Sequence, residues 1–275
     1  MEVTIKYATY DDLKACVKVE ENTMESLYYL AEVWDYFMHT KGELICACHQ
    51  DKIIGIGRFS VLPDKSGWLE TLRVLPEYQH CGVGKRIYDE YLTLAKKYHC
   101  PSIAMYTGSL KNISSALACK YGLSHSATFQ GCHLTSIHSC NKHHFKKISV
   151  ENALETIFSK EVNHSNYMCM NRTFYQLNTD NITQFALDGL IFKDESSDSL
   201  IILGSRFQHE KALHILFMQG NIEDCIDFAI NYAYCINIPK LSCTLEQRRI
   251  DLQENLEQRG FIKEPFTLVT LSKEF

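Results

Sequence analysis

Glycines, a glutamine and two basic residues come together in the stretch Gln79-His80-Cys81-Gly82-Val83-Gly84-Lys85-Arg86. Two glycines let a backbone approach a ligand closely, and the free N–H groups of a first helical turn favour a phosphate. Lys85 and Arg86 add positive charge beside them. The stretch lacks the ending of a Walker loop and the G-x-G-x-x-G of a dinucleotide fold. A short glycine motif is also typical of an ordinary turn, so its context must decide.

The elements around this loop are those that a phosphate site needs. Residues 68–74 alternate as a strand before it. One face of that strand is expected to carry Trp68, Glu70, Leu72 and Val74. Pro76 ends the strand, because proline has no N–H for a ladder. Apolar residues then recur at helical spacing over residues 87–98, so a helix begins where the glycines end.

This arrangement resembles the GNAT superfamily of acetyl-CoA-dependent N-acetyltransferases. In that family a strand ending in V-x-P precedes the loop [Q/R]-x-x-G-x-[G/A], which receives the pyrophosphate of CoA. This chain has Val74-x-Pro76 and Gln79-x-x-Gly82-x-Gly84. The order of strands and helices also fits the family over residues 3–129, nearly half the chain. The resemblance therefore implies acetyl-CoA as the co-substrate.

The resemblance also implies which residues contact the cofactor. Backbone N–H groups near residues 72–74 would stabilise the oxyanion that forms on the thioester carbonyl. Asn112, near the start of a later helix, would touch the pantetheine arm, although helix capping is a competing interpretation. The expected CoA-binding residues are Leu72, Arg73, Val74, Gln79, His80, Cys81, Gly82, Val83, Gly84, Lys85 and Asn112.

Acetyl transfer to an amine requires removal of the amine proton and a proton for the departing thiolate. Many members of the family carry a carboxylate at the position of Glu70. The resemblance thus implies that Glu70 takes the amine proton, directly or through water. Apolar neighbours would raise the pKa of Glu70 toward a useful range. A solvated or salt-bridged strand glutamate is the alternative interpretation.

The general acid is where the chain departs from the family pattern. Family members often read Ala-Leu-Tyr-Glu-Lys-Leu-Gly-Phe, whereas residues 116–123 read ALACKYGL, with Ala118 at the tyrosine position. Either the thiolate leaves without a protein acid, or Cys119, Tyr121 or another hydroxyl group takes that role. Tyr121 is the catalytic candidate, although a residue before a helix-ending glycine also commonly closes a core.

An aromatic helical pattern at residues 26–40 would border the acceptor site in the family. We expect Tyr28, Tyr29 and Trp34 to form a wall that recognises the acceptor. Trp34 also belongs to an apolar stripe with Leu30 and Phe37, and helical spacing of that kind favours a core position.

Composition and charge limit the other classes of function. The chain has 275 residues, 45% apolar and 22% charged, which suits two globular domains. It has neither an apolar run of membrane-spanning length nor a signal-peptide pattern, so a cytoplasmic protein is expected. A net charge of −5 without a basic run argues against nucleic acid and membrane as partners. The 12 cysteines are expected to be reduced thiols.

Cysteines and histidines are densest near the middle of the chain. This group contains Cys132, His133, His138, Cys140, His143 and His144. Their spacing matches no zinc template, so no metal is expected. The polar residues 141–147 mark a domain boundary. We expect a catalytic GNAT domain at residues 1–140 and a degenerate GNAT-like domain without a CoA loop at residues 148–275.

Residues 148–275 resemble a degenerate repeat of the first half of the chain. The spacing from Pro101 to Gly122 equals that from Pro239 to Gly260. Aligning residues 210–218 with residues 67–75 leaves the copy short where the glycine loop should be. The stretch there has one glycine and two acids, which would repel a pyrophosphate. The expected fold is α/β, with two GNAT-like domains, each a mixed, mostly antiparallel twisted sheet flanked by helices.

The expected function is acetyl transfer from acetyl-CoA to a primary amine of a small molecule, by direct attack. A free amino acid is one option for that acceptor. A non-catalytic acetyl-CoA sensor or interaction module, and a protein or peptide N-acetyltransferase, are the alternatives. The second half would shape the acceptor side or act as a structural half, and a homodimer is an option for the assembly.

Overall fold

The computed structural model describes residues 1–24, 28–109, 112–139, 144–159 and 166–275. Ser26, Cys140 and His143, which belong to patterns discussed above, lie outside the described residues. The chain forms two compact units. Unit 1 comprises residues 1–126 and 270–275, and unit 2 comprises residues 127–269. This division differs from the expected boundary at residues 141–147 in two ways. Unit 2 already begins at residue 127, because residues 129–134 pair with residues 241–246, and residues 270–275 return to unit 1.

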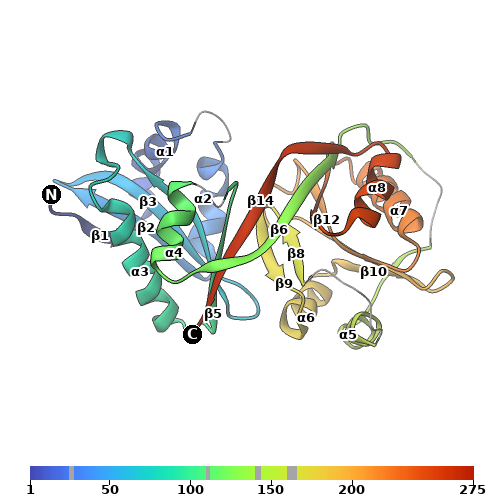
Figure 1. The fold of residues 1–275 in the computed structure, drawn as a ribbon. Coiled ribbons are helices and arrows are strands. Elements are labelled where there is room, and N and C mark those ends of the chain that lie inside the picture. Colours follow the sequence, from blue (N-terminus) through green and yellow to red (C-terminus); the bar gives the residue numbers. More distant parts are fainter. Residues whose placement is uncertain (25–27, 110–111, 140–143, 160–165) are drawn as a thin grey trace. The chain divides into compact units, whose positions relative to one another are not determined.

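Unit 1 is built on a sheet with the strand order β1-β2-β3-β4-β5 (Figure 1). The strands are β1 (Thr4–Tyr7), β2 (Gly42–His49), β3 (Lys52–Val61), β4 (Gly67–Val74) and β5 (Ser102–Thr107). Neighbours from β1 to β4 are antiparallel, and β4 and β5 are parallel. Among the described residues, β1 to β4 precede the glycine loop, which agrees with the order of elements expected from the family.

Helices cover both faces of this sheet. They are α1 (Leu13–Glu21), α2 (Leu30–His39), α3 (Val83–Lys97) and α4 (Ile113–Lys120). A side chain at Gly57 of β3 would collide with Ile87 and Tyr91 of α3, so this residue faces α3. The next residue, Arg58, lies over the Phe37 ring of α2 at 5.3 Å. Because successive strand residues alternate, α3 covers one face and α2 the other.

Two long strands, β6 (Ser124–Leu134) and β14 (Ile262–Glu274), contribute residues to both units. Within unit 1, the Ser126 and Ser272 hydroxyl groups are hydrogen-bonded at 2.6 Å. The backbone N–H of Phe275 donates to the carbonyl of Pro101 at 2.9 Å, so the C-terminus pairs beside β5. Leu271 is fully buried. The last residues of the chain are thus part of the packed structure of unit 1.

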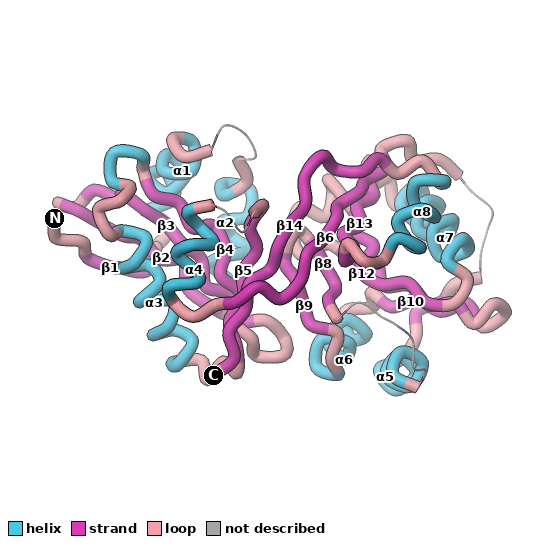
Figure 2. The backbone as a smooth tube through the Cα atoms, in the orientation of Figure 1, coloured by secondary structure: helices cyan, strands magenta, loops and turns pink. Residues whose placement is uncertain are grey.

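Unit 2 has a sheet with the order β6-β13-β12-β11-β10-β7. Figure 2 labels its strands β6, β13, β12 and β10. Its further strands are β7 (Lys146–Lys147), β10 (Ile191–Asp194), β11 (Ser199–Gly204), β12 (Leu213–Gln219) and β13 (Leu241–Glu246). Strands β8 (Tyr167–Met170) and β9 (Thr173–Gln176) form a separate antiparallel hairpin. The helices are α5 (Val150–Phe158), α6 (Thr179–Leu187), α7 (Ile222–Cys235) and α8 (Ile250–Gln258).

The two units repeat one order of elements. In unit 1 it is β2-β3-β4-α3-β5-α4-β6, and in unit 2 it is β10-β11-β12-α7-β13-α8-β14. The pair β12 and β13 is parallel, like β4 and β5. In register, Gly67 faces Ile103 and Leu213 faces Leu241. If β5 and β13 are aligned on their prolines, Leu213 therefore takes the place of Gly67, and the predicted alignment from residue 210 is wrong by three residues.

Candidate functional site

The central strand of unit 1 contains a bulge that the sequence did not predict. In the β3–β4 ladder, Arg58 pairs with Glu70 and Ile56 pairs with Arg73, so Thr71 and Leu72 together oppose a single residue of β3. Thr71 has a φ of 60°, in the left-handed region that a threonine rarely adopts. It is 5% exposed. An inserted residue bends the strand and reverses the alternation of side chains beyond it.

The bulge places Glu70 and Arg73 on the same face of the sheet. Their partners Arg58 and Ile56 are two residues apart and share a face, and residues paired across strands lie on the same side. This is the face of α2, because Arg58 lies over Phe37. Val74 instead pairs with Gly55, on the opposite face. The prediction that Glu70 and Val74 share a face is therefore wrong.

A chain of hydrogen bonds holds the carboxylate of Glu70. The Ser60 hydroxyl donates to Oε1 of Glu70 at 2.6 Å, and Nε of Arg58 donates to the Ser60 oxygen at 3.1 Å. Arg58 is only 1% exposed. A polar donor thus holds this carboxylate on the side of β3, where the sequence predicted apolar surroundings.

Tyr29, directly before α2, contacts the bulge. The Tyr29 and Thr71 hydroxyl groups are hydrogen-bonded at 2.8 Å. Burial, followed by the charge of Glu70, raises the pKa of Tyr29, which keeps its hydroxyl group protonated. Glu20 at the end of α1 is 1% exposed and accepts hydrogen bonds from the backbone N–H groups of Tyr29 and Leu30 at 3.2 and 3.0 Å. This carboxylate therefore fixes the start of α2.

Tyr28 and Trp34, the other expected acceptor contacts, lie in different environments. Tyr28 is 50% exposed, and its hydroxyl donates to the carbonyl of Met24 at 2.9 Å. Trp34 is 2% exposed and packs in the core, which agrees with the apolar-stripe interpretation. Of the three aromatic residues, Tyr29 is the one that is hydrogen-bonded to the bulge of β4.

Strands β4 and β5 share a register only at their beginnings. Gly67 pairs with Ile103 and Trp68 with Ala104, and among the described residues no register joins residues 69–74 to β5. Backbone groups that leave a ladder need other partners. The backbone of Leu72, Arg73 and Val74, expected to contact the cofactor, lies in this diverging part of β4.

The glycine loop leads into a helix whose N-terminus is open. Gly82 occupies the cap position of α3 with a φ of 88°, which favours glycine. In the described part of the chain, no side chain caps this end, and its first turn contains no acid. Val83 is buried and can contribute only its backbone. Four expected cofactor residues around this end are exposed: Gln79, His80, Cys81 and Lys85. These features suit a phosphate group.

The equivalent end in unit 2 is closed. Only Gly220 and Asn221 separate β12 from α7. The Asn221 side chain accepts hydrogen bonds from the backbone N–H groups of Glu223 and Asp224, and both acids lie in the first turn. Donors that would face an anion are thus occupied, and two negative charges lie beside them.

Asn112 and Tyr121 both have partners within unit 1. The Asn112 side-chain oxygen caps α4 by accepting from the N–H of Ser115 at 2.8 Å, and its amide nitrogen donates to Thr107 at 2.6 Å. The structure therefore shows the capping role. The Tyr121 hydroxyl donates to Asp89 at 2.8 Å. Burial and this hydrogen bond raise the pKa of Tyr121 to about 12.

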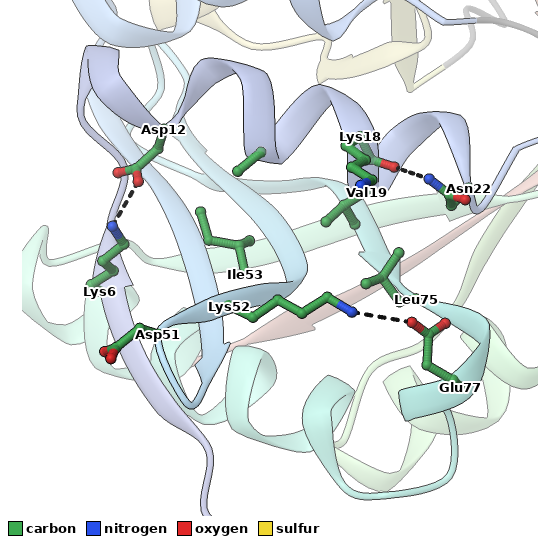
Figure 3. Close-up of a pocket in the computed structure, with 11 residues that line it drawn as sticks. Lys6, Asp12, Lys18, Val19, Asn22, Asp51, Lys52, Ile53, Leu75 and Glu77 are labelled. Atoms are coloured by element: carbon green, nitrogen blue, oxygen red, sulfur yellow. Dashed lines mark hydrogen bonds and ion pairs between the residues drawn. The ribbon is translucent and has the colours of Figure 1, made fainter.

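A cavity of about 460 Å³ lies beside α1 (Figure 3). Two ion pairs cross its wall, from Lys6 to Asp12 at 2.7 Å and from Lys52 to Glu77 at 3.4 Å. Its lining consists of Lys6, Asp12, Ala15, Lys18, Val19, Asn22, Asp51, Lys52, Ile53, Leu75 and Glu77. No residue expected to contact the cofactor or the acceptor belongs to this lining.

Sequence reasoning missed the roles of Arg58, Ser60 and Glu20. A signal existed for Glu20, because it occurs at helical spacing with Cys16 and Val19, two buried residues of α1. A glutamate on such a stripe indicates a buried carboxylate. In the described ranges, no three His, Cys, Asp or Glu side chains are grouped so as to hold a metal ion. Within these ranges no helix is both long and apolar enough to cross a membrane.

Comparisons with known proteins concern the family of unit 1 and the fold. The model of the acetyltransferase (GNAT) family matches residues 7–121. Among curated proteins, none matches the sequence. A GCN5-related N-acetyltransferase from Sphaerobacter thermophilus has a similar structure, with a TM-score of 0.68 at 10% identity, over 99% of this chain and 95% of that chain.

A tandem GNAT protein from the clavulanic acid biosynthesis pathway is similar over 99% of this chain and 98% of its own, with a TM-score of 0.63 at 9% identity. At such identities the likeness concerns the fold, which consists of two GNAT-like domains in one chain. The family match covers the glycine loop, Glu70 and the bulged strand. Residues 7–121 of this chain therefore belong to the acetyltransferase (GNAT) family.

Proposed function

We propose that unit 1 transfers an acetyl group from acetyl-CoA to a primary amine of a small molecule, by direct attack. One observation supports this proposal most strongly. A helix N-terminus without a capping side chain or an acid follows the strand that presents a hydrogen-bonded glutamate on the α2 face. Anion binding and proton removal are the two tasks that such a transfer requires.

The residues of unit 1 divide the work as follows. Bound acetyl-CoA supplies the acetyl thioester. The open end of α3, with Lys85 beside it, binds the pyrophosphate, and the backbone of residues 72–74 donates hydrogen bonds to the thioester carbonyl. Glu70 accepts the proton of the attacking amine, directly or through water, while Ser60 holds its carboxylate in place. Tyr121, whose hydroxyl stays protonated, or solvent then protonates the thiolate.

The proposal is tested by a thiol-release assay with acetyl-CoA and a panel of amines. The panel contains free amino acids, polyamines, aminoglycosides and peptides with free N-termini, so that it also covers protein-directed acetylation. Release with one acceptor class is expected, and Glu70→Gln should lower kcat at least about 100-fold while acetyl-CoA binding changes little.

Glu257→Gln, an exposed position in α8, is the matched control and should retain full activity. Tight acetyl-CoA binding without release for any amine would contradict the enzyme and favour a sensor. Full activity of the Glu70→Gln variant would refute the role of Glu70 as the base.

A further inference from the structure

Glu70 and Arg73 form a pair of opposite charges on the α2 face of the sheet. Their partners on β3 are two residues apart, which corresponds to about 7 Å along a strand. Without the bulge, residues three apart would face opposite sides. The carboxylate of Glu70 and the guanidinium group of Arg73 therefore lie on the same face of the sheet.

Arg73 has unused hydrogen-bonding capacity. Its Nη1 donates to the carbonyl of Leu72 at 2.9 Å, whereas its Nε is buried and has no partner among the described residues. A buried donor without a partner is costly and usually indicates a missing ligand or water. Guanidinium donors are arranged to match the two oxygens of a carboxylate.

Glu20 is the charge that could otherwise satisfy Arg73. Its Oε2 accepts hydrogen bonds from the N–H groups of Tyr29 and Leu30, whereas its Oε1 is buried and has no hydrogen-bond partner among the described residues. Burial raises the pKa of Glu20, and the nearby charge of Arg73 lowers it to a smaller extent. The guanidinium is therefore near Glu20 without being bound to it. A purely structural role of Arg73 would consist of this long-range neutralisation.

We propose that Arg73 binds a carboxylate of the acceptor, so that the substrates of unit 1 are small amines that carry a carboxylate near the amine, such as free amino acids. This inference rests on the proposed acetyl transfer. The positive amine of such a zwitterion would lie at Glu70 before it loses its proton, and the carboxylate would lie at Arg73. Charge complementarity of this kind selects a partner and fixes its orientation.

The test compares each amino acid with its amide, which retains the amine and lacks the carboxylate. In the wild-type chain, kcat/KM should be about 10- to 100-fold higher for the acid than for the amide, because a charge-assisted pair is lost in the amide. Arg73→Gln should lower the ratio of kcat/KM for the acid to kcat/KM for the amide to about one.

Two further variants distinguish binding of the acceptor carboxylate by Arg73 from a structural role of Arg73. Arg73→Lys retains the charge without the paired donors and should preserve part of the preference for the acid. Lys14→Gln removes an exposed cation from α1 and should leave the preference unchanged. Equal turnover of acid and amide by the wild-type chain would overturn this inference and leave the proposed acetyl transfer intact.

A loss of activity in Arg73→Gln that is equal for acid and amide would assign Arg73 a structural role and would also overturn the inference. If Arg73→Gln fails to fold, the ratio of kcat/KM for the acid to kcat/KM for the amide in the wild-type chain still shows whether the carboxylate is recognised. If no amine of any kind is acetylated, the proposed function falls and this inference falls with it.

Discussion

At the scale of single residues, the chemistry of unit 1 depends on which face of β4 each side chain occupies. Glu70 accepts a hydrogen bond from Ser60, and Arg73 lies on the same face only because Thr71 and Leu72 oppose one residue of β3. In the reaction that we propose, a carboxylate base and a cation would therefore meet the same acceptor. Removal of the bulge would transfer Arg73 to the α3 side of the sheet.

Titration of a buried histidine gives a prediction for unit 2. Burial, with smaller effects from Lys240 and Arg172, lowers the pKa of His214 from 6.5 to about 4. Between these values the unfolded chain binds a proton that the folded chain does not, so stability falls as the pH falls. We expect His214 to contribute up to about 1.4 kcal/mol per pH unit to that loss.

Denaturant unfolding of His214→Gln between pH 7 and pH 4 measures this contribution. The variant should show a flatter dependence of its unfolding free energy on pH than the wild-type chain. His209→Gln, an exposed position, should keep the wild-type slope. Parallel curves for wild-type and His214→Gln would show that His214 does not titrate as described.

At the scale of elements, the starts of α3 and α7 differ in the features that decide whether an anion can bind. The start of α3 has Gly82 and no acid in its first turn, whereas Asn221 caps α7 beside Glu223 and Asp224. The same element order thus gives an open helix end in one unit and a closed end in the other.

An acidic residue at the start of α3 should make this helix end unfavourable for an anion, as Glu223 and Asp224 do at the start of α7. Lys85→Glu puts a negative charge in the first turn and removes a positive one, so the Kd for acetyl-CoA should rise at least about tenfold. Isothermal titration measures this change. Lys14→Glu makes the same change of net charge on α1 and should bind acetyl-CoA normally. Equal affinity of the two variants would contradict a role of the α3 start in cofactor binding.

Local signals allowed the loop and its neighbouring elements to be predicted. Glycines mark the start of α3, and Asn112, expected near the start of a later helix, directly precedes α4. The bulge could not be predicted, because Thr71 occupies the left-handed region without the glycine or asparagine that normally indicates it. Its conformation is imposed by pairing with β3. The sequence also left undecided whether Trp34 lies in the core or at the acceptor site. Helical spacing identifies an apolar face of a helix but not the surface against which it packs.

At the scale of the whole molecule, the two units are linked through the path of the chain. Residues 270–275 belong to unit 1, although residues 127–269 form unit 2. This return could not be predicted from sequence, because it depends on pairing between residues as distant as Pro101 and Phe275. Deletion of residues 148–275 would therefore also remove part of unit 1, and it would not isolate the contribution of unit 2.

In the function that we propose, unit 1 binds acetyl-CoA at β4 and the start of α3, and the equivalent part of unit 2 does not. Hydrogen exchange of the full chain, followed by mass spectrometry with and without saturating acetyl-CoA, tests it most directly. We expect slower exchange over residues 72–86 and unchanged exchange over residues 218–224, because only the first helix end offers open donors. Unchanged exchange over residues 72–86, or slower exchange over residues 218–224, would contradict the claim.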